Sequence, residues 1–244
     1  GKVNVFNLWR EGIDLSLGTN DEKVGEYAIK SFVAATKALK EGDIDVLVTA
    51  PINKYNIQSD SFKFPGHTDY LDKELEGDAL MLMVQDNLRV GLLTDHIPLN
   101  EVASHLTEEL IFKKIKTINQ TLIQDFSINK PKIAVLGLNP HCGDGGVIGT
   151  EDDTVLKPAL KKLFEKGTLV FGPFPADGFF GSNQYEKYDA VIAAYHDQGL
   201  IPFKTLSSIT KIAPIFFSPI LTNASYTVME GSTEYTSFPF TANI

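Results

Sequence analysis

The chain has 244 residues, of which 43% are hydrophobic and 22% charged, and its formal net charge at pH 7 is −9. A chain of this length and composition can bury a substantial core, and its acidic balance argues against nucleic acid or an anionic membrane as a partner. The single cysteine, Cys142, excludes an internal disulfide framework and favours a reducing compartment, so we expect a cytoplasmic protein without a membrane span.

Helical and strand-like patterns alternate through the first part of the chain. Apolar residues at three-to-four spacing predict a helix over 21–42, which Gly42 ends. A short strand over 44–50 follows, and Pro51 stops it. The same order recurs as a helix over 107–126 and a strand that ends at Asn139.

The alternation continues beyond the middle of the chain. A third helix is predicted over 151–166, with its start limited by Pro158, and strands are predicted over 168–177 and up to His196. This order predicts a mainly parallel α/β sheet. Residues 207–244 hold twelve Ser or Thr and only three charged residues without a sustained period, so we predict no fold for them.

Three histidines stand at the ends of apolar, strand-like runs. The runs are Arg89–His96, Lys132–His141 and Asp189–His196. A histidine at a strand end is often only hydrogen-bonded to a loop carbonyl, but three of them in Gly, Pro and Asp contexts favour a shared role. Because ligands bind outside the carboxyl ends of parallel strands, we predict that His96, His141 and His196 bind a divalent metal. His105, in a helical setting, is assigned no role.

The loop over 139–146 is the richest in glycine, which allows sharp turns and a close approach of backbone N–H groups to a ligand. It is equally compatible with a plain tight loop. Cys142 lies beside His141 and is a possible soft ligand, but a lone buried cysteine is more often a small apolar residue. We therefore leave Cys142 out of the predicted site.

Two further segments carry candidate side chains. His67 and Thr68 follow a Pro-Gly turn and can hydrogen-bond a phosphate or hydroxyl, although Thr68 and Asp69 could equally cap the helix that follows. In 195–204, the pair His196 and Asp197 supplies a metal ligand and a proton acceptor, and Lys204 is predicted a short loop away as a cation for an anionic substrate group. Asp177 ends its own strand in the equivalent way.

Five motifs resemble those of the 4-hydroxythreonine-4-phosphate dehydrogenase family, and they occur along the chain in the same order as in that family. They are Val48–Lys54 (VTAPINK), Pro65–Thr68 (PGHT), Leu138–His141 (LNPH) with its continuation to Gly149–Asp152 (GTED), Gly172–Asp177 (GPFPAD) and Tyr195–Gly199 (YHDQG). The resemblance spans roughly residues 1 to 206. It implies an isopropylmalate-dehydrogenase-like fold, with two α/β domains around a cleft.

The resemblance also implies an activity. The family oxidises the C3 hydroxyl of 4-phosphooxy-L-threonine with NAD or NADP, and the product then loses CO₂ to give 3-amino-2-oxopropyl phosphate in pyridoxal 5'-phosphate (vitamin B6) biosynthesis. A Lewis-acid metal suits this chemistry because it stabilises negative charge on the alcohol oxygen. Imidazole ligands favour zinc, with cobalt or magnesium as other candidates.

Site residues carry over by motif. The metal ligands implied are His96, His141 and His196, brought together at the interface of a homodimer, and the substrate-binding residues are His67, Thr68 and Lys204. We predict Asp197 and Asp177 as catalytic carboxylates. The implied division of the chain is a remnant of a first α/β domain over 1–60, a middle domain with the metal site and dimer interface over 61–200, and a return to an incomplete first domain over 201–244.

Two departures from the family pattern are visible. The chain starts downstream of the family's Gly-rich opening segment, and residues 207–244 contain no Arg, no His and one Gly where the family has a segment rich in Gly, Asn and Arg. Since arginine binds phosphate through strong paired hydrogen bonds, we expect weakened phosphate and cofactor binding, as in an incomplete or frame-shifted dehydrogenase.

Two other classes remain as alternatives. Three histidines and an aspartate can activate water in a metal-dependent hydrolase, although the His-x-His and His-Glu-x-x-His spacings of such enzymes are missing. The atypical tail also favours a non-catalytic metal- or phosphate-binding protein. Binding of NAD would distinguish the dehydrogenase from both.

Overall fold

The computed structural model describes residues 3–14, 16, 18–207, 212–218 and 226–231. The strands are β1 (Leu47–Val48), β2 (Asp78–Gln85), β3 (Leu88–Leu92), β4 (Ile133–Leu136), β5 (Val170–Phe174), β6 (Ala190–Ala193), β7 (Ile212–Ser218) and β8 (Tyr226–Gly231). The α-helices are α1 (Glu22–Glu41), α2 (His67–Glu74), α3 (Val102–His105), α4 (Glu108–Gln124), α5 (Lys157–Glu165), α6 (Ala176–Gly181) and α7 (His196–Leu206).

The predicted first helix is confirmed as α1, with both of its ends set by local sequence. The Asp21 side chain caps the first turn by accepting hydrogen bonds from the backbone N–H groups of Lys23 and Val24. Gly42 ends the helix in the left-handed conformation with φ of 78°. Its apolar stripe, which includes Phe32 and Leu39, is buried.

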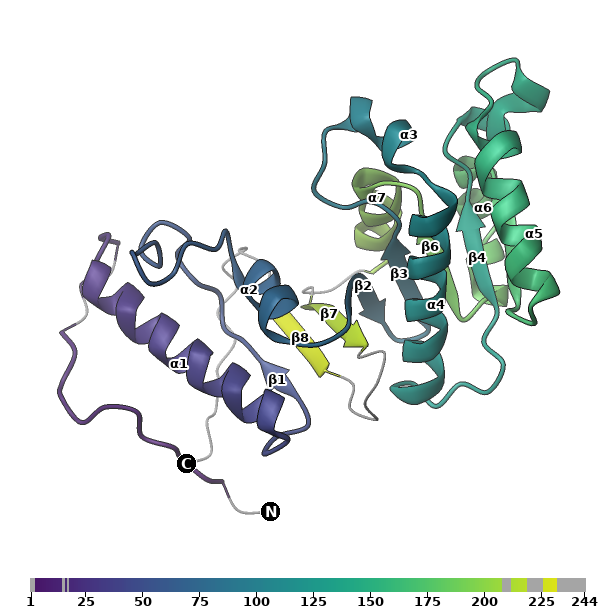
Figure 1. The fold of residues 1–244 in the computed structure, drawn as a ribbon. Helices are drawn as coiled ribbons and strands as arrows, with labels where there is room; N and C mark the ends of the chain where they lie inside the picture. The colour runs from purple at the N-terminus through teal and green to yellow at the C-terminus, as the bar shows by residue number, and fades with distance from the viewer. Residues whose placement is uncertain (1–2, 15, 17, 208–211, 219–225, 232–244) are drawn as a thin grey trace.

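The first hydrophobic core joins α1, β1 and α2. Its buried members are Phe32, Leu39, Leu47, Ile57, Phe62, Leu71 and Leu75. Figure 1 shows these elements grouped together on one side of the molecule, with β8 beside β1. In the structure this core therefore extends through residue 75, beyond the predicted division at residue 60.

One mixed sheet connects this unit to the rest of the chain. Its strand order is β1-β8-β7-β2-β3-β6-β4-β5. The pairs β3–β6, β6–β4 and β4–β5 are all parallel, whereas β2 is antiparallel to both of its neighbours. The predicted mainly parallel α/β architecture is confirmed, and its parallel part carries the three histidine runs.

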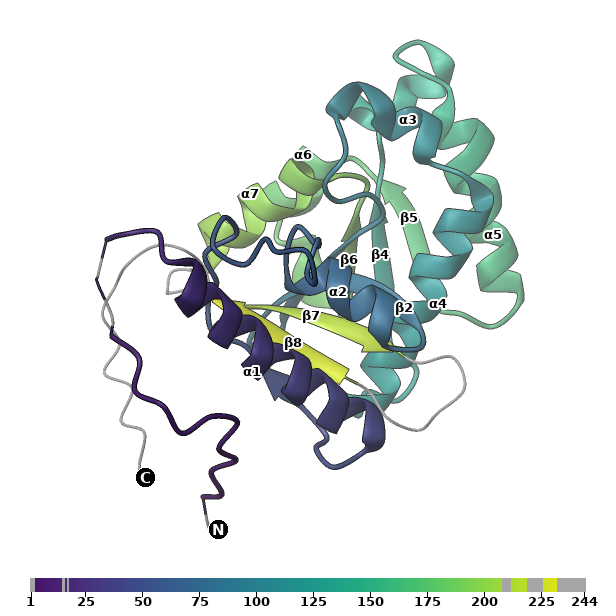
Figure 2. The same ribbon diagram turned by 60° about the vertical axis from the view of Figure 1, so that its left-hand side comes forward.

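The parallel strands are covered on both faces, and successive residues alternate between two cores. In β4, Ile133 and Val135 face the core built with α4 and α5, whereas Ala134 and Leu136 face the core built with Phe179 and Phe203 of α6 and α7. Figure 2 shows α4 and α5 on one side of these strands and α6 and α7 on the other. Burial on both faces explains why these strands read as continuous apolar runs.

Several predicted elements differ in extent. The strand predicted over 44–50 is only β1, two residues long. The third helix begins with a π-helical turn, Asp152–Leu156, and becomes α-helical as α5 close to Pro158, as the sequence indicated. Residues 207–244, for which no fold was predicted, contribute the backbones of β7 and β8 to the sheet. Strand β2 was missed, although the turn at 86–87 after an apolar run is a hairpin signal.

No helix in the described part of the chain is long and apolar enough to cross a membrane.

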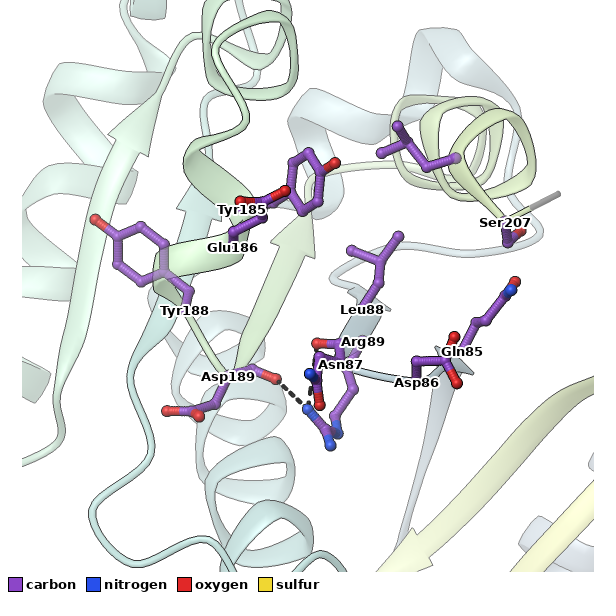
Figure 3. A pocket seen from close by; sticks show the side chains of 11 residues that line it. Gln85, Asp86, Asn87, Leu88, Arg89, Tyr185, Glu186, Tyr188, Asp189 and Ser207 are labelled. Carbon is purple, nitrogen blue, oxygen red and sulfur yellow. Dashed lines mark hydrogen bonds between the residues drawn. The ribbon is translucent and has the colours of Figure 1, made fainter.

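Arg89 forms contacts near the start of β3, at the end of the parallel strands that lies away from the predicted metal site. Its guanidinium lies 4.6 Å from the centroid of the Phe126 ring, and its Nη1 donates to the carbonyls of Asp189 (3.2 Å) and Asn87 (3.3 Å). Figure 3 shows these bonds beside a cavity of about 720 Å³ that Tyr185 and other residues line. Burial lowers the pKa of Arg89, although the Asp189 carboxylate opposes that shift.

Arg89→Lys is therefore expected to lower the free energy of unfolding by about 1–2 kcal/mol, because an ammonium cannot reproduce the planar fork or its stacking. Urea denaturation measures this loss. Arg10→Lys is the matched control, since Arg10 is the other arginine of the sequence and is exposed; we expect a change within about 0.5 kcal/mol for it. Equal losses of stability in the two variants would show that the contacts of the Arg89 guanidinium do not stabilise the fold.

Candidate metal centre at the carboxyl ends of the parallel strands

The three predicted histidines follow three strands that lie side by side. Strand β6 is in the middle, with β3 and β4 as its parallel neighbours, and Ile192 of β6 pairs with Gly91 and Val135. Parallel neighbours end at the same edge of a sheet. The turns that carry His96, His196 and His141 therefore leave the sheet at one edge, and the turn after β5 adds Asp177 there.

His96 and His196 form a pair in one shallow pocket. Their ring centroids are 5.6 Å apart, and both line a cavity of about 350 Å³ together with Asp95, Tyr195 and Asp197. The Nδ1 atom of His196 lies 2.8 Å from Asp197 Oδ1, within hydrogen-bond distance. That contact leaves Nε2 as the His196 nitrogen that can coordinate a metal, with the carboxylate fixing the ring from behind.

His141 lies in the neighbouring pocket. This cavity of about 330 Å³ is also lined by Asn139, Asp177, Gln198 and Tyr195. Tyr195 lines both pockets, so the two are adjacent. Within the described residues of one chain, no group of three or more His, Cys, Asp or Glu side chains is gathered closely enough to hold a metal. The structure thus brings the imidazoles of His96 and His196 together and places that of His141 in the adjacent pocket.

The loop that presents His141 has an unusual backbone. His141 and Cys142 both have φ of 53°, and Asp144 has φ of 44°, in the left-handed region that non-glycine residues rarely adopt. Gly143 is needed within this path, because a Cβ atom there would lie 2.4 Å from the Gly149 carbonyl oxygen. Such a conformation persists only where surrounding bonds hold it.

Asp152 holds the two residues that precede this loop. Its side chain is fully buried, and Oδ1 accepts a hydrogen bond from the Leu138 N–H (2.8 Å). Oδ2 accepts from the backbone N–H (2.9 Å) and the side-chain amide (3.1 Å) of Asn139. The carboxylate therefore fixes the two residues that lead into Pro140 and His141. The sequence pattern indicated no role for Asp152 beyond its place in the Gly149–Asp152 motif.

Cys142 is buried on the same loop as His141. Burial, reinforced by the nearby Asp152 carboxylate, raises the pKa of its thiol to about 11. A thiol with this pKa is protonated at neutral pH in the metal-free protein. The omission of Cys142 from the site stays a prediction.

His67 and Thr68 lie apart from the two pockets, at the start of α2. Gly66 occupies the N-cap position, so the interpretation of Thr68 and Asp69 as capping residues is wrong. The His67 ring is 2% exposed and packs edge-on against Phe32 at 4.7 Å. In this structure it belongs to the first core, and its role in substrate binding stays a prediction.

Lys204 lies in α7, two turns after His196, and not beyond a short loop as predicted. Helix α7 continues through Pro202, which the sequence pattern did not indicate. Lys204 is exposed and lines neither histidine pocket. Its role as a phosphate-side cation likewise stays a prediction.

Imidazole and carboxylate side chains beyond the carboxyl ends of parallel strands are placed as in the α/β proteins that bind ligands at that edge of the sheet. The family model described as pyridoxal phosphate biosynthetic protein PdxA matches residues 1–220. Proteins named 4-hydroxythreonine-4-phosphate dehydrogenase from Bacteroides thetaiotaomicron and a Sulfurihydrogenibium species are 44% and 40% identical to this chain over 208 and 206 residues. The chain belongs to the PdxA family.

Solved structures give the same result. The chain superposes on the Klebsiella pneumoniae 4-hydroxythreonine-4-phosphate dehydrogenase with a TM-score of 0.77 and 30% identity, covering 88% of this chain and 64% of that one. The two curated relatives above are covered over 84% of this chain but only 57% and 62% of their own lengths. These matches favour the dehydrogenase over the hydrolase and the non-catalytic binding protein, and they confirm the predicted fold class.

Proposed function

We propose that this chain carries the catalytic edge of a metal-dependent dehydrogenase that oxidises 4-phosphooxy-L-threonine at C3 with NAD or NADP, followed by decarboxylation. The observation that supports this most directly is the arrangement of β3, β6 and β4. Three adjacent parallel strands each deliver one histidine to the same edge.

The donor set fits a divalent transition metal. His96, His141 and His196 would hold the ion, and imidazole nitrogens favour zinc, with cobalt and magnesium as other candidates. When bound, such an ion supplies a Lewis acid for the substrate's alcohol oxygen. The Asp197 contact with His196 Nδ1 orients that ring and leaves Nε2 as its donor.

The carboxylates of Asp197 and Asp177 are proposed to act as proton acceptors. Asp197 is 73% exposed at its side chain and lines the His96 pocket, so it can accept a proton from a bound hydroxyl. Asp177 occupies the equivalent place in the His141 pocket. His67, Thr68 and Lys204 are proposed to contact the substrate, with Lys204 on the phosphate side.

A homodimer is the proposed state of this cytoplasmic enzyme. One chain gathers two imidazoles and holds the third in the neighbouring pocket, and large apolar side chains lie exposed around the same edge. Leu99 is 70% exposed, and Val147, directly after the glycine-rich loop, is 82% exposed. A second copy covering this surface would bury these side chains and complete the ligand set.

Removing one imidazole tests the metal site. His96→Ala, His141→Ala and His196→Ala are each expected to weaken binding of Zn²⁺ or Co²⁺ about 100-fold or more, since a ligand contributes more than the residues that only orient it. Calorimetric titration of the metal-free protein measures the affinity. His105→Ala is the control, because His105 lies at the exposed end of α3 with its Nδ1 near the Glu101 carbonyl.

Activity is followed as NADH absorbance with Zn²⁺, NAD and 4-phosphooxy-L-threonine. Turnover that the three substitutions abolish and His105→Ala leaves unchanged is the expected result. Metal affinity that is equally insensitive to all four substitutions would refute the proposed site, and failure to bind NAD would refute the proposed reaction.

A further inference from the structure

Gln198 uses both ends of its side-chain amide. It lies in the first turn of α7, two residues after His196. Its Oε1 accepts a hydrogen bond from the Ala194 N–H (2.7 Å), and its Nε2 donates to the Gly137 carbonyl (2.7 Å). The side chain is half-buried and lines the His141 pocket.

The two Gln198 bonds link β4 and β6 beyond the point where backbone pairing between these strands ends. The last backbone pair between β4 and β6 is Val135 with Ile192. Ala194 and Gly137 lie two residues further along each strand direction, and Gln198 is the group that joins them. If the Gln198 side chain were removed, the backbone segments at Ala194 and Gly137 would have no hydrogen-bonded link between them at this position.

Gln198 also completes a row of hydrogen bonds that crosses the parallel strands. Thr94, after β3, donates from both its N–H (3.2 Å) and its Oγ1 (2.8 Å) to the Ala194 carbonyl. On the other side, the Gly137 N–H donates to the Phe174 carbonyl of β5 (2.8 Å). Each of these positions lies a few residues before His96, His196, His141 or Asp177. The side chain of Gln198 joins the β3–β6 half of this row to the β4–β5 half.

We propose that Gln198 is a positioning residue that sets the separation between the turn of His196 and the turn of His141, and so fixes where each imidazole is presented to the metal site that two copies of the chain would share. This inference rests on the proposed metal site. The role requires one acceptor and one donor on the same short side chain. Glutamate retains the acceptor but has no donor for Gly137, and methionine has the length of glutamine with neither group.

Asp189 offers a matched control at the opposite edge of the same two strands. Its Oδ2 accepts from the Lys132 N–H (2.7 Å), and its N–H donates to the Lys132 carbonyl (2.8 Å), so it joins the starts of β6 and β4. Removing the Asp189 side chain breaks a comparable cross-strand bond without touching the histidine edge. A purely structural role for Gln198 would make the two sites behave alike.

The test compares Gln198→Met, Gln198→Glu and Asp189→Ala in the full chain. Co²⁺ affinity and the visible absorption bands of the Co²⁺-loaded protein are measured, together with the free energy of unfolding in urea and the histidine ring resonances of the metal-free protein by NMR. Gln198→Met and Gln198→Glu are expected to weaken Co²⁺ binding about 10-fold or more, to alter the absorption bands and to shift the His141 and His196 resonances.

Asp189→Ala is expected to lower stability while leaving Co²⁺ affinity and these resonances unchanged. Unshifted His141 and His196 resonances in the Gln198 variants would overturn the inference, and so would an unchanged Co²⁺ affinity in a parent chain that binds the ion. A parent that binds no Co²⁺ refutes the proposed metal site instead, and in that case the resonances of the metal-free protein still decide whether Gln198 positions the two turns.

Discussion

Asp152→Leu is expected to lower the free energy of unfolding by about 3–5 kcal/mol and to weaken metal binding through His141. The carboxylate accepts hydrogen bonds from three N–H groups of Leu138 and Asn139 in a fully buried position. Leucine leaves these donors without acceptors, and each buried unsatisfied donor costs about 1–3 kcal/mol. Burial of the leucine side chain is favourable and offsets part of this cost, but the loss of three hydrogen-bond acceptors outweighs it and decides the sign.

The neighbouring residue provides the control. Asp153 is partly exposed and forms an ion pair with Lys157 one helical turn away. Asp153→Asn is expected to cost less than about 1 kcal/mol, as for other exposed pairs. Urea denaturation monitored by circular dichroism gives both values, and calorimetry with Zn²⁺ reports on the His141 loop. A destabilisation by Asp152→Leu no larger than that of Asp153→Asn would show that the carboxylate does not hold the loop.

Gly25→Ala is the second substitution with a large expected effect. Gly25 is buried in the first turn of α1, where its backbone lies against Asn56. A Cβ atom there would lie 1.8 Å from the Asn56 carbonyl oxygen and 2.5 Å from the carbon of that carbonyl. Both are backbone atoms, so no side-chain rotation can relieve the overlap. Helix α1 must move away from residues 53–57.

Alanine normally stabilises a helix relative to glycine by about 1 kcal/mol. Overpacking costs about 1–3 kcal/mol and occasionally more, and an overlap with backbone atoms lies at the upper end of that range. After the gain in helix propensity is subtracted, we expect a net destabilisation of about 2 kcal/mol. Gly178→Ala in α6 is the control, because a Cβ atom there meets nothing within 4 Å. Thermal unfolding should place the two variants on opposite sides of the parent, and equal melting temperatures would contradict the predicted clash.

The parts of the fold that follow from local sequence were predictable. Helix α1 was placed correctly because Asp21 and Gly42 cap it through bonds to residues at most four positions away. The three histidine strands were also recognised, since burial on both faces gives each of them an unbroken apolar run. That β3, β6 and β4 are neighbours is a property of the sheet order, which a single sequence does not contain.

The missed features depend on distant partners or on competing local signals. Gln198 bonds to Gly137, 61 residues earlier, and Asp152 bonds to Leu138, 14 residues earlier. No spacing rule connects such positions. Lys204 was predicted beyond a loop because Pro202 normally interrupts a helix, whereas packing of Leu200 and Phe203 in the core keeps α7 continuous.

The sheet order has a consequence for how the chain acquires its shape. Strand β8 is the neighbour of β1, so Leu47 pairs with Val228, and β7 and β8 separate β1 from β2 although the latter two are close in sequence. Pairing between such remote segments slows folding, because the entropy of closing a long loop is lost before any stabilising contact forms. Strand β1 therefore has no partner on this side until residue 228 has been synthesised, and until then its unpaired edge is open to association with other nascent chains.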